Sequence, residues 1–436
     1  MKISHQILGS VFVPVSAVAS VQVSVVQIVD VVAVGHRSVA ASRTVFVFVM
    51  GVLDTVGQLA LVPMVVVLVM SMAVVDVVDV IAVNDGHVSA VGTVDVRMIL
   101  VALVVVTFGS IHEHSLASAR AGVWNVNVTS AVDRLLDASI VGGFSRLGYE
   151  VRSRRRGWET FSSDALSGRR IVVTGPTSGI GRALAGQLAG MGARLVLVGR
   201  DESRVRRVAD ELGSTSEHEV VVADMSDLHA VSRAVDRIVA GGVPDVVVHN
   251  AGALLHDRVA TPQGFETTIA THVLAPHLVT RRLASARTIW VSSGGMYGAT
   301  LPDVSHRDPM QPPKYDGTRQ YATAKRMQVT LIEEWASREP KRFFASMHPG
   351  WADTPGVRSS LPGFARITSP VLRSADQGAD TVTWLCATTT DQPSGRFWSD
   401  RETRPIHRLP STKRSDTPSR RRSMWEWADR LTAEWT

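Results

Sequence analysis

The chain of 436 residues is poor in several side chains that carry common chemistry, since it has one cysteine, four tyrosines and five lysines. Cys386 cannot form an internal disulfide, and no second thiol can join it in a metal site. This cysteine usage fits a reducing compartment, so we expect a cytoplasmic protein. The 14 histidines show no metal-ligand spacing, and we expect no metal cofactor.

Positive charge comes mostly from arginine and gives a formal net charge of +6. The arginines are scattered or lie in two clusters, at 152–156 and 420–422, without interleaved aromatic side chains. Such clusters are typical of solvated surface, whereas nucleic-acid sites concentrate basic side chains on one face. We therefore expect no nucleic-acid partner.

The composition changes abruptly near residue 131. Valine makes up 40 of the first 131 residues, where lysine occurs only as Lys2 and glutamate only as Glu113. This mixture is unlike that of an ordinary soluble domain. Residues 1–131 are therefore expected to form a separate valine-rich segment, and normal usage of charge and leucine begins at Val132.

Three interpretations of the valine-rich segment compete. Residues 59–75 form an apolar run near the short limit for crossing a bilayer, but a proline interrupts it and two aspartates follow. The first 20 residues imitate a secretory signal, with a lysine, an apolar run and small residues. The hypothesis we favour is that the segment is not native coding sequence and that translation starts at Val132, because GUG is a permitted bacterial start codon.

From residue 169 onward, short β-branched runs alternate with helical stretches. Strands that are apolar throughout are typical of a parallel sheet covered on both faces. The pattern predicts a doubly wound α/β domain (Rossmann fold), a single catalytic domain at 169–405. An amphipathic helical leader at 132–168 precedes it, and a C-terminal tail with a short helix follows at 406–436. The expected strands lie in RIVVTG (170–175), RLVLVGR (194–200), HEVVVADM (218–225), PDVVVHNAG (244–252), RTIWVSSGG (287–295), RFFASMHPG (342–350) and GRFWSD (395–400).

The first of these strands runs into a glycine-rich turn, TGPTSGIG. Gly175, Gly179 and Gly181 leave backbone N–H groups and the following helix N-terminus accessible to a pyrophosphate. Glycine turns also occur for steric reasons alone, but the position between a buried strand and an apolar helix favours a dinucleotide site. Ser178 and Ile180 of the same turn are expected to contact the cofactor.

The end of the second strand bears on the choice between NADP and NAD. An acid at this position accepts from the ribose 2′-OH of NAD, whereas an arginine suits the 2′-phosphate of NADP. Arg200 holds the position, so NADP is the expected cofactor, with NAD also admitted. The alternative is that Arg200 is a surface residue and Asp201 takes the ribose.

Two later strand ends complete the expected cofactor site. Asp224 and Met225 follow the third strand, where an acid and a backbone amide can bracket the adenine edge. Asn250, Ala251 and Gly252 follow the fourth strand, where small residues let the backbone pass close to the cofactor.

A tyrosine and a rare lysine stand four residues apart in YATAK. The spacing places Tyr321 and Lys325 on one helix face. An ammonium near the hydroxyl favours the phenolate and lowers the tyrosine pKa from its usual 10, which suits acid–base catalysis. Ser293 ends the fifth strand, where ligands bind in such sheets, although a serine there is more often a turn or cap residue.

Together these motifs resemble the short-chain dehydrogenase/reductase family, in the order TGPTSGIG, ADMSD, HNAG, VSSGG, YATAK and MHPGWADT. Longer segments between 132 and 436 are similar to one subgroup of it. The resemblance implies that Ser293 orients the substrate oxygen and that Tyr321 is the general acid/base. It implies that Lys325 lowers the pKa of Tyr321 and binds the nicotinamide ribose. It also implies that the nicotinamide carboxamide is held by Pro349, Gly350 and Thr354.

Two features depart from the family pattern. The interval from Ser293 to Tyr321 is long, so an inserted loop at 301–318 is expected to border the substrate pocket. His272 stands where the family commonly has the asparagine of its proton relay. An imidazole can also donate and accept, so His272 is a candidate catalytic residue; the alternative is that it only packs in a helix.

The expected function is that of an NADP-preferring oxidoreductase, which moves a hydride between nicotinamide and a carbonyl or secondary alcohol. Segment 355–370 is expected to help cover this small-molecule substrate. One alternative is a dinucleotide-binding sensor or scaffold without turnover, and another is a reductase anchored to a membrane by residues 1–131. We expect no membrane partner, and a homo-oligomer is left open.

Overall fold

The computed structural model describes residues 136, 139–213 and 218–436, and the backbone of seven strands between residues 18 and 93. The chain divides into two units, residues 1–120 and 121–436. In the first unit, one sheet has the order β1-β4-β5, and β2-β3 and β6-β7 form two pairs. Their bounds are β1 Val18–Gln27, β2 Val34–Gly35, β3 Ser38–Val39, β4 Phe46–Asp54, β5 Leu59–Pro63, β6 Asp79–Asn84 and β7 His87–Thr93.

Of the apolar run 59–75, only residues 59–63, in β5, are described. The remainder of the run, and the first 17 residues of the chain, lie outside the described residues. Within the described part of the chain, no helix is both long enough and apolar enough to cross a membrane. The interpretations of the valine-rich segment therefore stay predictions.

The second unit is built on an eight-stranded sheet of order β10-β9-β8-β11-β12-β13-β14-β15. Its strands are β8 Arg170–Thr174, β9 Arg194–Gly199, β10 Glu219–Val222, β11 Val246–His249, β12 Arg287–Val291, β13 Phe343–Met347, β14 Arg396–Ser399 and β15 Glu402–Thr403. All neighbours are parallel except β14 and β15. The doubly wound sheet and its seven expected strands are confirmed. The strand order reverses between β8 and β11, where such sheets bind ligands.

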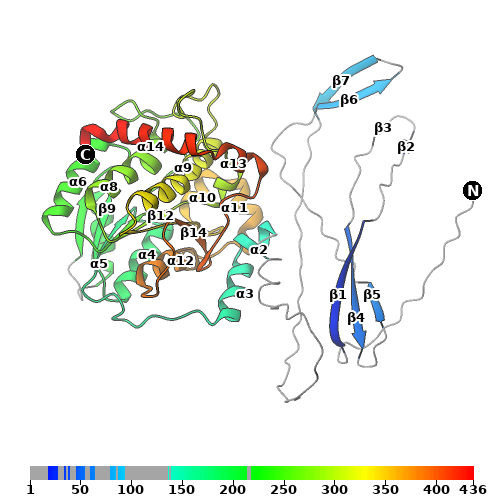
Figure 1. The fold of residues 1–436 in the computed structure, drawn as a ribbon, viewed down its shortest axis with the longest axis horizontal. Helices are drawn as coiled ribbons and strands as arrows, with labels where there is room; N and C mark the ends of the chain where they lie inside the picture. Colours follow the sequence, from blue (N-terminus) through cyan, green and yellow to red (C-terminus); the bar gives the residue numbers. More distant parts are fainter. Residues whose placement is uncertain are drawn as a thin grey trace, which may run out of the picture. The chain divides into compact units, whose positions relative to one another are not determined.

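Helices cover both faces of this sheet (Figure 1). Val172 packs with α6, α8, α9 and α14, while its neighbours Ile171 and Val173 pack with α4, α5 and α12. Alternate residues of a strand point to opposite faces, so both faces of a buried strand must be apolar. These helices are α4 Gly179–Gly190, α5 Glu202–Glu211, α6 Leu228–Ala240, α8 Ala275–Leu283, α9 Gly317–Arg338, α12 Ala375–Ala387 and α14 Pro418–Thr432.

Shorter helices lie between these elements. They are α7 Thr267–Ile269, η2 Ala270–Leu274, η3 Gly294–Gly298, α10 Pro355–Ser360, α11 Pro362–Thr368, η4 Ser369–Val371, α13 Pro410–Ser415 and η5 Ala433–Trp435. The leader contains α2 Ile140–Phe144 and α3 Arg146–Arg156. Leader residues 132–135, 137 and 138 lie outside the described residues.

The C-terminal tail is more helical than expected. Figure 1 shows α14, in red, lying across α8 and α9. Met424, Trp425 and Trp427 are buried in the core between them. Burying such large apolar side chains is worth about 1.5–3 kcal/mol each, so the tail is part of the domain rather than an appendage.

Candidate active site

The glycine turn after β8 has the geometry of an anion-binding loop. Gly175 has φ +69°, and a Cβ there would lie 2.8 Å from the Ala251 Cα. A Cβ at Gly181 would overlap the Gly175 carbonyl oxygen, so both positions require glycine. Ser178 caps α4 without a side-chain cap bond, which leaves its exposed hydroxyl and the helix N–H groups for a phosphate.

The turn is held in place by the end of β11. The Asn250 Nδ2 donates to the carbonyl oxygens of Thr174 at 3.0 Å and Gly175 at 3.1 Å. The Thr174 hydroxyl accepts from the backbone N–H groups of Asn250 and Ala251, both at 3.0 Å. Thr174 was missed in the sequence, where its signal is a hydroxyl directly before the glycine turn. Asn250 thus positions the turn through its own side chain.

The strand end after β9 favours Arg200 over Asp201 as a cofactor contact. Asp201 caps α5, and its Oδ1 accepts from the Arg204 N–H at 3.1 Å and the Ser203 hydroxyl at 2.7 Å. The Ser203 bond first, and then the Arg204 N–H, hold the pKa of Asp201 below its usual value. Arg200 is exposed, and it has no hydrogen bond or ion pair with any residue that the structure describes.

Asp224 and Met225 offer an adenine different groups: Asp224 its side-chain carboxylate and Met225 its backbone. Asp224 Oδ1 accepts from the Ser226 backbone N–H and hydroxyl, both at 2.8 Å. The Met225 side chain is buried in the core, so this residue would meet an adenine through its backbone, as expected. Ile180 is partly buried against the opposite core face.

The structure brings Ser293, Tyr321 and Lys325 together at the carboxyl end of β12. Ser293 lies close enough to the Tyr321 hydroxyl to affect its pKa. Ser293 Oγ accepts from the Gly295 N–H at 3.2 Å and so caps η3, while its role toward a substrate stays a prediction. Lys325 Nζ lies 5.3 Å from the centre of the Tyr321 ring, one turn along α9.

Burial controls the charges of this group. It raises the pKa of Tyr321 above its usual 10, and the neighbouring Ser293 side chain opposes this only in part. It lowers the pKa of Lys325 to about 7. The Lys325 Nζ donates to the Val291 carbonyl at 2.8 Å. In the chain by itself, the tyrosine pKa is therefore not lowered as the sequence predicts, because desolvation of the buried hydroxyl raises it.

His272 is buried and packs edge-on against Tyr321, with ring centres 5.3 Å apart. Its Nε2 lies 3.0 Å from the Ala253 carbonyl oxygen and 3.2 Å from the Ala253 nitrogen. A Cβ at Gly252 would overlap the imidazole, so this glycine makes room for the ring. Burial, and secondarily Lys325, lower the pKa of His272 well below 6.5, so the ring is neutral near pH 7.

A π-helix underlies the placement of His272, which the sequence did not reveal. The element η2 (Ala270–Leu274) interrupts the helix formed by α7 and α8. The carbonyl of His272 accepts from Gln328 Nε2 of α9 at 2.8 Å. Such π-turns are frequent at functional sites, and here the turn faces the helix that carries Tyr321.

The loop after β13 closes the site from another side. Gly350 has φ +74°, and Pro349 precedes it. Thr354 caps α10 by accepting from the Val357 N–H at 3.2 Å, and its Cβ lies beside Gly179 of the glycine turn. The following segment, α10 and α11, is tied to the loop after β11 by a Ser360 hydroxyl bond to the Leu254 carbonyl at 3.1 Å.

The inserted loop 301–318 is anchored at both ends. Asp303 pairs with Arg420 of the C-terminal tail at 3.2 Å. The Tyr315 hydroxyl donates to buried Glu266 at 3.1 Å, just before α7. The loop leads directly into α9, the helix that carries Tyr321. That it borders the substrate pocket stays a prediction.

A surface depression of about 550 Å³ is lined by Gly179, Asp353 and Asp376, among other residues. Ser293, Tyr321 and Lys325 do not line it.

A family model described as "short chain dehydrogenase" matches residues 169–295. The chain belongs to the short-chain dehydrogenase/reductase family, whose members are oxidoreductases. It is 37% identical over 305 residues to "Dehydrogenase/reductase SDR family member 12" of Bos taurus, covering 66% of this chain and 93% of the relative. The Homo sapiens protein of that name is 36% identical and covers 61% and 87%. This is the subgroup that the longer segments resemble.

"Retinol dehydrogenase 12" of Homo sapiens is a more distant relative. It is 29% identical over 251 residues, covering 54% of this chain and 78% of the relative.

Proposed function

We propose that this protein transfers a hydride between NADP(H) and a carbonyl or secondary alcohol. The observation that carries the proposal is the grouping of Ser293 and Tyr321 with buried Lys325 at the carboxyl end of β12, where Lys325 Nζ lies 5.3 Å from the Tyr321 ring centre. The glycine turn after β8 suits the pyrophosphate of the cofactor, because Gly175 and Gly181 let the turn pack closely on Ala251 and Asn250 at the N-terminus of α4. The cofactor, when bound, supplies or accepts the hydride.

The protein side of the reaction is the handling of one proton. Since the raised pKa keeps Tyr321 protonated at neutral pH, its hydroxyl is a proton donor for the reduction of a carbonyl. Ser293 holds the substrate oxygen beside that hydroxyl. In reduction the proton moves from the Tyr321 Oη to the substrate oxygen, and in oxidation it returns.

The preference for NADP rests on Arg200. It is the charged side chain at the end of β9 that has no partner in the described part of the chain, while Asp201 is engaged as a helix cap. An arginine offers a phosphate charge-assisted hydrogen bonds, often two in parallel. Pro349, Gly350 and Thr354 would hold the nicotinamide end, at the loop that faces the glycine turn.

The substrate belongs to the aldehydes, ketones and their alcohols. The name of a relative, "Retinol dehydrogenase 12", supports an alcohol or its carbonyl as the reacting group. Phe364, in the segment expected to cover the substrate, packs on Trp351 of the loop after β13 with ring centres 5.3 Å apart. An apolar carbonyl compound fits this wall best.

A substrate screen tests the proposal. Purified protein is incubated with a panel of carbonyl compounds and alcohols, each with NADPH or NADP⁺ and with NADH or NAD⁺, while absorbance of the reduced cofactor is followed. Turnover that prefers the phosphorylated cofactor is the expected result. Tight NADPH binding without turnover on any compound would favour the sensor or scaffold instead.

A further inference from the structure

Three consecutive carbonyl groups of the leader contact the loop after β13 and Arg373. The Phe144 carbonyl accepts from the Trp351 N–H at 2.8 Å. The neighbouring carbonyls of Gly143 and Ser145 accept from Arg373 Nη2 at 3.3 Å and Nε at 3.2 Å. The backbone between α2 and α3 is thus bonded to the loop and to the arginine behind it.

Arg373 joins the same loop from its other side. Its backbone N–H donates to the Trp351 carbonyl at 2.7 Å, and its carbonyl accepts from the Asp353 N–H at 2.8 Å. A Cβ at Gly350 would overlap the Arg373 guanidinium and would lie 2.7 Å from the Phe144 carbonyl oxygen. Glycine is required at position 350 because the leader and Arg373 both lie against it.

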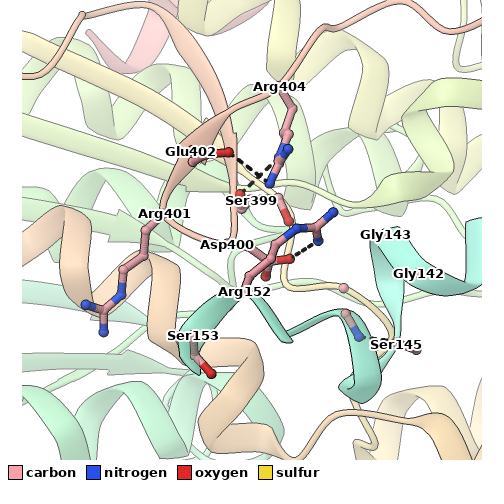
Figure 2. Close-up of polar contacts among 12 residues, drawn as sticks. Gly142, Gly143, Ser145, Arg152, Ser153, Ser399, Asp400, Arg401, Glu402 and Arg404 are labelled. Atoms are coloured by element: carbon pink, nitrogen blue, oxygen red, sulfur yellow. Dashed lines mark hydrogen bonds and ion pairs between the residues drawn. The ribbon is translucent and has the colours of Figure 1, made fainter. Parts of the chain in front are cut away.

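A buried carboxylate fixes these pieces to one another. Asp400 accepts from Arg373 at 2.6 and 3.1 Å, and from Arg152 of the leader at 2.5 Å. Figure 2 shows Arg152 reaching Asp400 from α3, below the hairpin of β14 and β15. All three side chains are at most 1% exposed. Burial would raise the pKa of Asp400, but Arg373 and then Arg152 outweigh it and hold the pKa below its usual value.

Phe144 links the leader to the strand end that carries Ser293. Its ring stacks on His348 at 4.7 Å and on Trp351 at 5.8 Å between ring centres. A Cβ at Gly294, the residue after Ser293, would overlap the Phe144 ring. The Trp351 ring also meets Phe364 of α11 edge-on. A single leader side chain therefore supports both sides of the candidate site.

We propose that leader residues 139–156 are a positioning element of the active site. Phe144, together with the Arg152–Asp400–Arg373 cluster, holds loop 348–354 in the arrangement that receives the nicotinamide end of the cofactor. The proposal rests on the proposed function of this loop. The leader contacts go to Gly294, Gly350 and Trp351, at the rim of the site, so loss of the leader disturbs the nicotinamide end before the distant adenosine end.

The first experiment measures hydrogen exchange of the Trp351 and Asp353 amides in the full chain. In Phe144→Ala both amides should exchange about tenfold faster, because the ring that supports the loop is gone. Phe144→Leu keeps most of the apolar volume and should lie between this variant and wild type. Leu147→Ala, at a half-exposed position of α3, is the matched control and should exchange like wild type. Unchanged exchange at Trp351 and Asp353 in folded Phe144→Ala would overturn the proposal.

The second experiment compares two ligands on the same proteins by fluorescence titration. NADPH reaches the loop, whereas 2′-phospho-ADP-ribose lacks nicotinamide. Phe144→Ala should weaken NADPH about tenfold, the equivalent of one lost hydrogen bond, and leave 2′-phospho-ADP-ribose within twofold. Phe144→Leu should recover part of the loss. Equal weakening of both ligands would show a general structural role and contradict positioning. If wild type binds neither ligand, the proposed function fails. The exchange experiment then tests the leader role alone, and an unchanged exchange rate at Trp351 in Phe144→Ala refutes that role.

Discussion

Tyr321 and Lys325 are one helical turn apart, and burial rather than their mutual attraction dominates their ionisation. The lysine is 3% exposed, and this loss of hydration lowers its pKa to about 7. The spacing of the pair could be predicted from the sequence, because it depends on local helix geometry. The direction of the tyrosine pKa could not, because it depends on how much water the folded protein removes.

We propose that Arg200 sets the cofactor preference. Arg200→Asp replaces a phosphate-binding cation by an acid, so NADPH should bind about 10- to 100-fold more weakly while NADH changes little. Arg207→Asp, at an exposed position of α5, makes the same charge change and serves as the control. The dissociation constants of both cofactors provide the measurement. An unchanged ratio of the two constants would assign the role to another residue.

His272 should remain neutral throughout the pH range of an assay, since burial and Lys325 lower its pKa well below 6.5. Wild type and His272→Asn should therefore give kcat profiles of the same shape between pH 6 and 9, with similar heights. His272→Leu cannot bond to Ala253 and should be less active. Three kcat profiles of equal height would mean that the histidine only packs. An inflection near pH 6.5 in the wild-type profile that is absent from His272→Asn would contradict a buried, neutral ring.

At the element scale, Glu266 connects three segments that meet beside the site. It is fully buried and accepts from the backbone of Thr268 and Ile269, which start the interrupted helix, both at 2.9 Å. It also accepts from Tyr315 of the inserted loop at 3.1 Å and from Gln320 of α9 at 3.0 Å. Since Gln320 precedes Tyr321, one carboxylate joins the inserted loop, α7 and α9.

Replacing Glu266 by alanine leaves these buried donors without partners. The free energy of unfolding should fall by about 3 kcal/mol, because unsatisfied buried groups keep their full desolvation cost. Glu334→Ala, which loses only the surface ion pair with Arg338 on α9, should cost less than about 1 kcal/mol. Urea denaturation of both variants measures the difference. Equal losses would mean that Glu266 does not connect these elements.

The sequence predicts elements well and their long-range connections poorly. The seven parallel strands were predictable because strands buried on both faces are apolar throughout, as Ile171, Val172 and Val173 illustrate. The short β15 could not be predicted, because it forms only through a turn in which Asp400 and Arg401 adopt positive φ. Arg152 and Asp400 are 248 positions apart, and no local pattern announces such a pair.

At the scale of the whole molecule, the described second unit contains every residue proposed for the site. Its sheet, both helical layers, the leader and the C-terminal tail form continuous cores. We propose that the valine-rich segment 1–131 contributes nothing to folding or activity of this unit, in keeping with translation from Val132.

A chain that begins at Val132 tests this proposal. It should be folded, with a cooperative melting transition and NADPH binding equal to those of the full chain, because the leader helices from Ile140 onward are retained. Circular dichroism and fluorescence titration provide the measurements. Loss of folding or of binding in the shorter chain would show that residues 1–131 belong to the functional protein.

The central claim is that this protein moves a hydride while Tyr321 moves the proton. The most direct test incubates NADPH, deuterated at the transferred position, with an active carbonyl compound and follows deuterium in the alcohol product by mass spectrometry. Wild type should place the label on the carbinol carbon. Tyr321→Phe keeps the ring but lacks the proton, so labelling should slow by about 10²–10⁴-fold while NADPH binding is unchanged. Labelling by Tyr321→Phe at the wild-type rate would contradict the account.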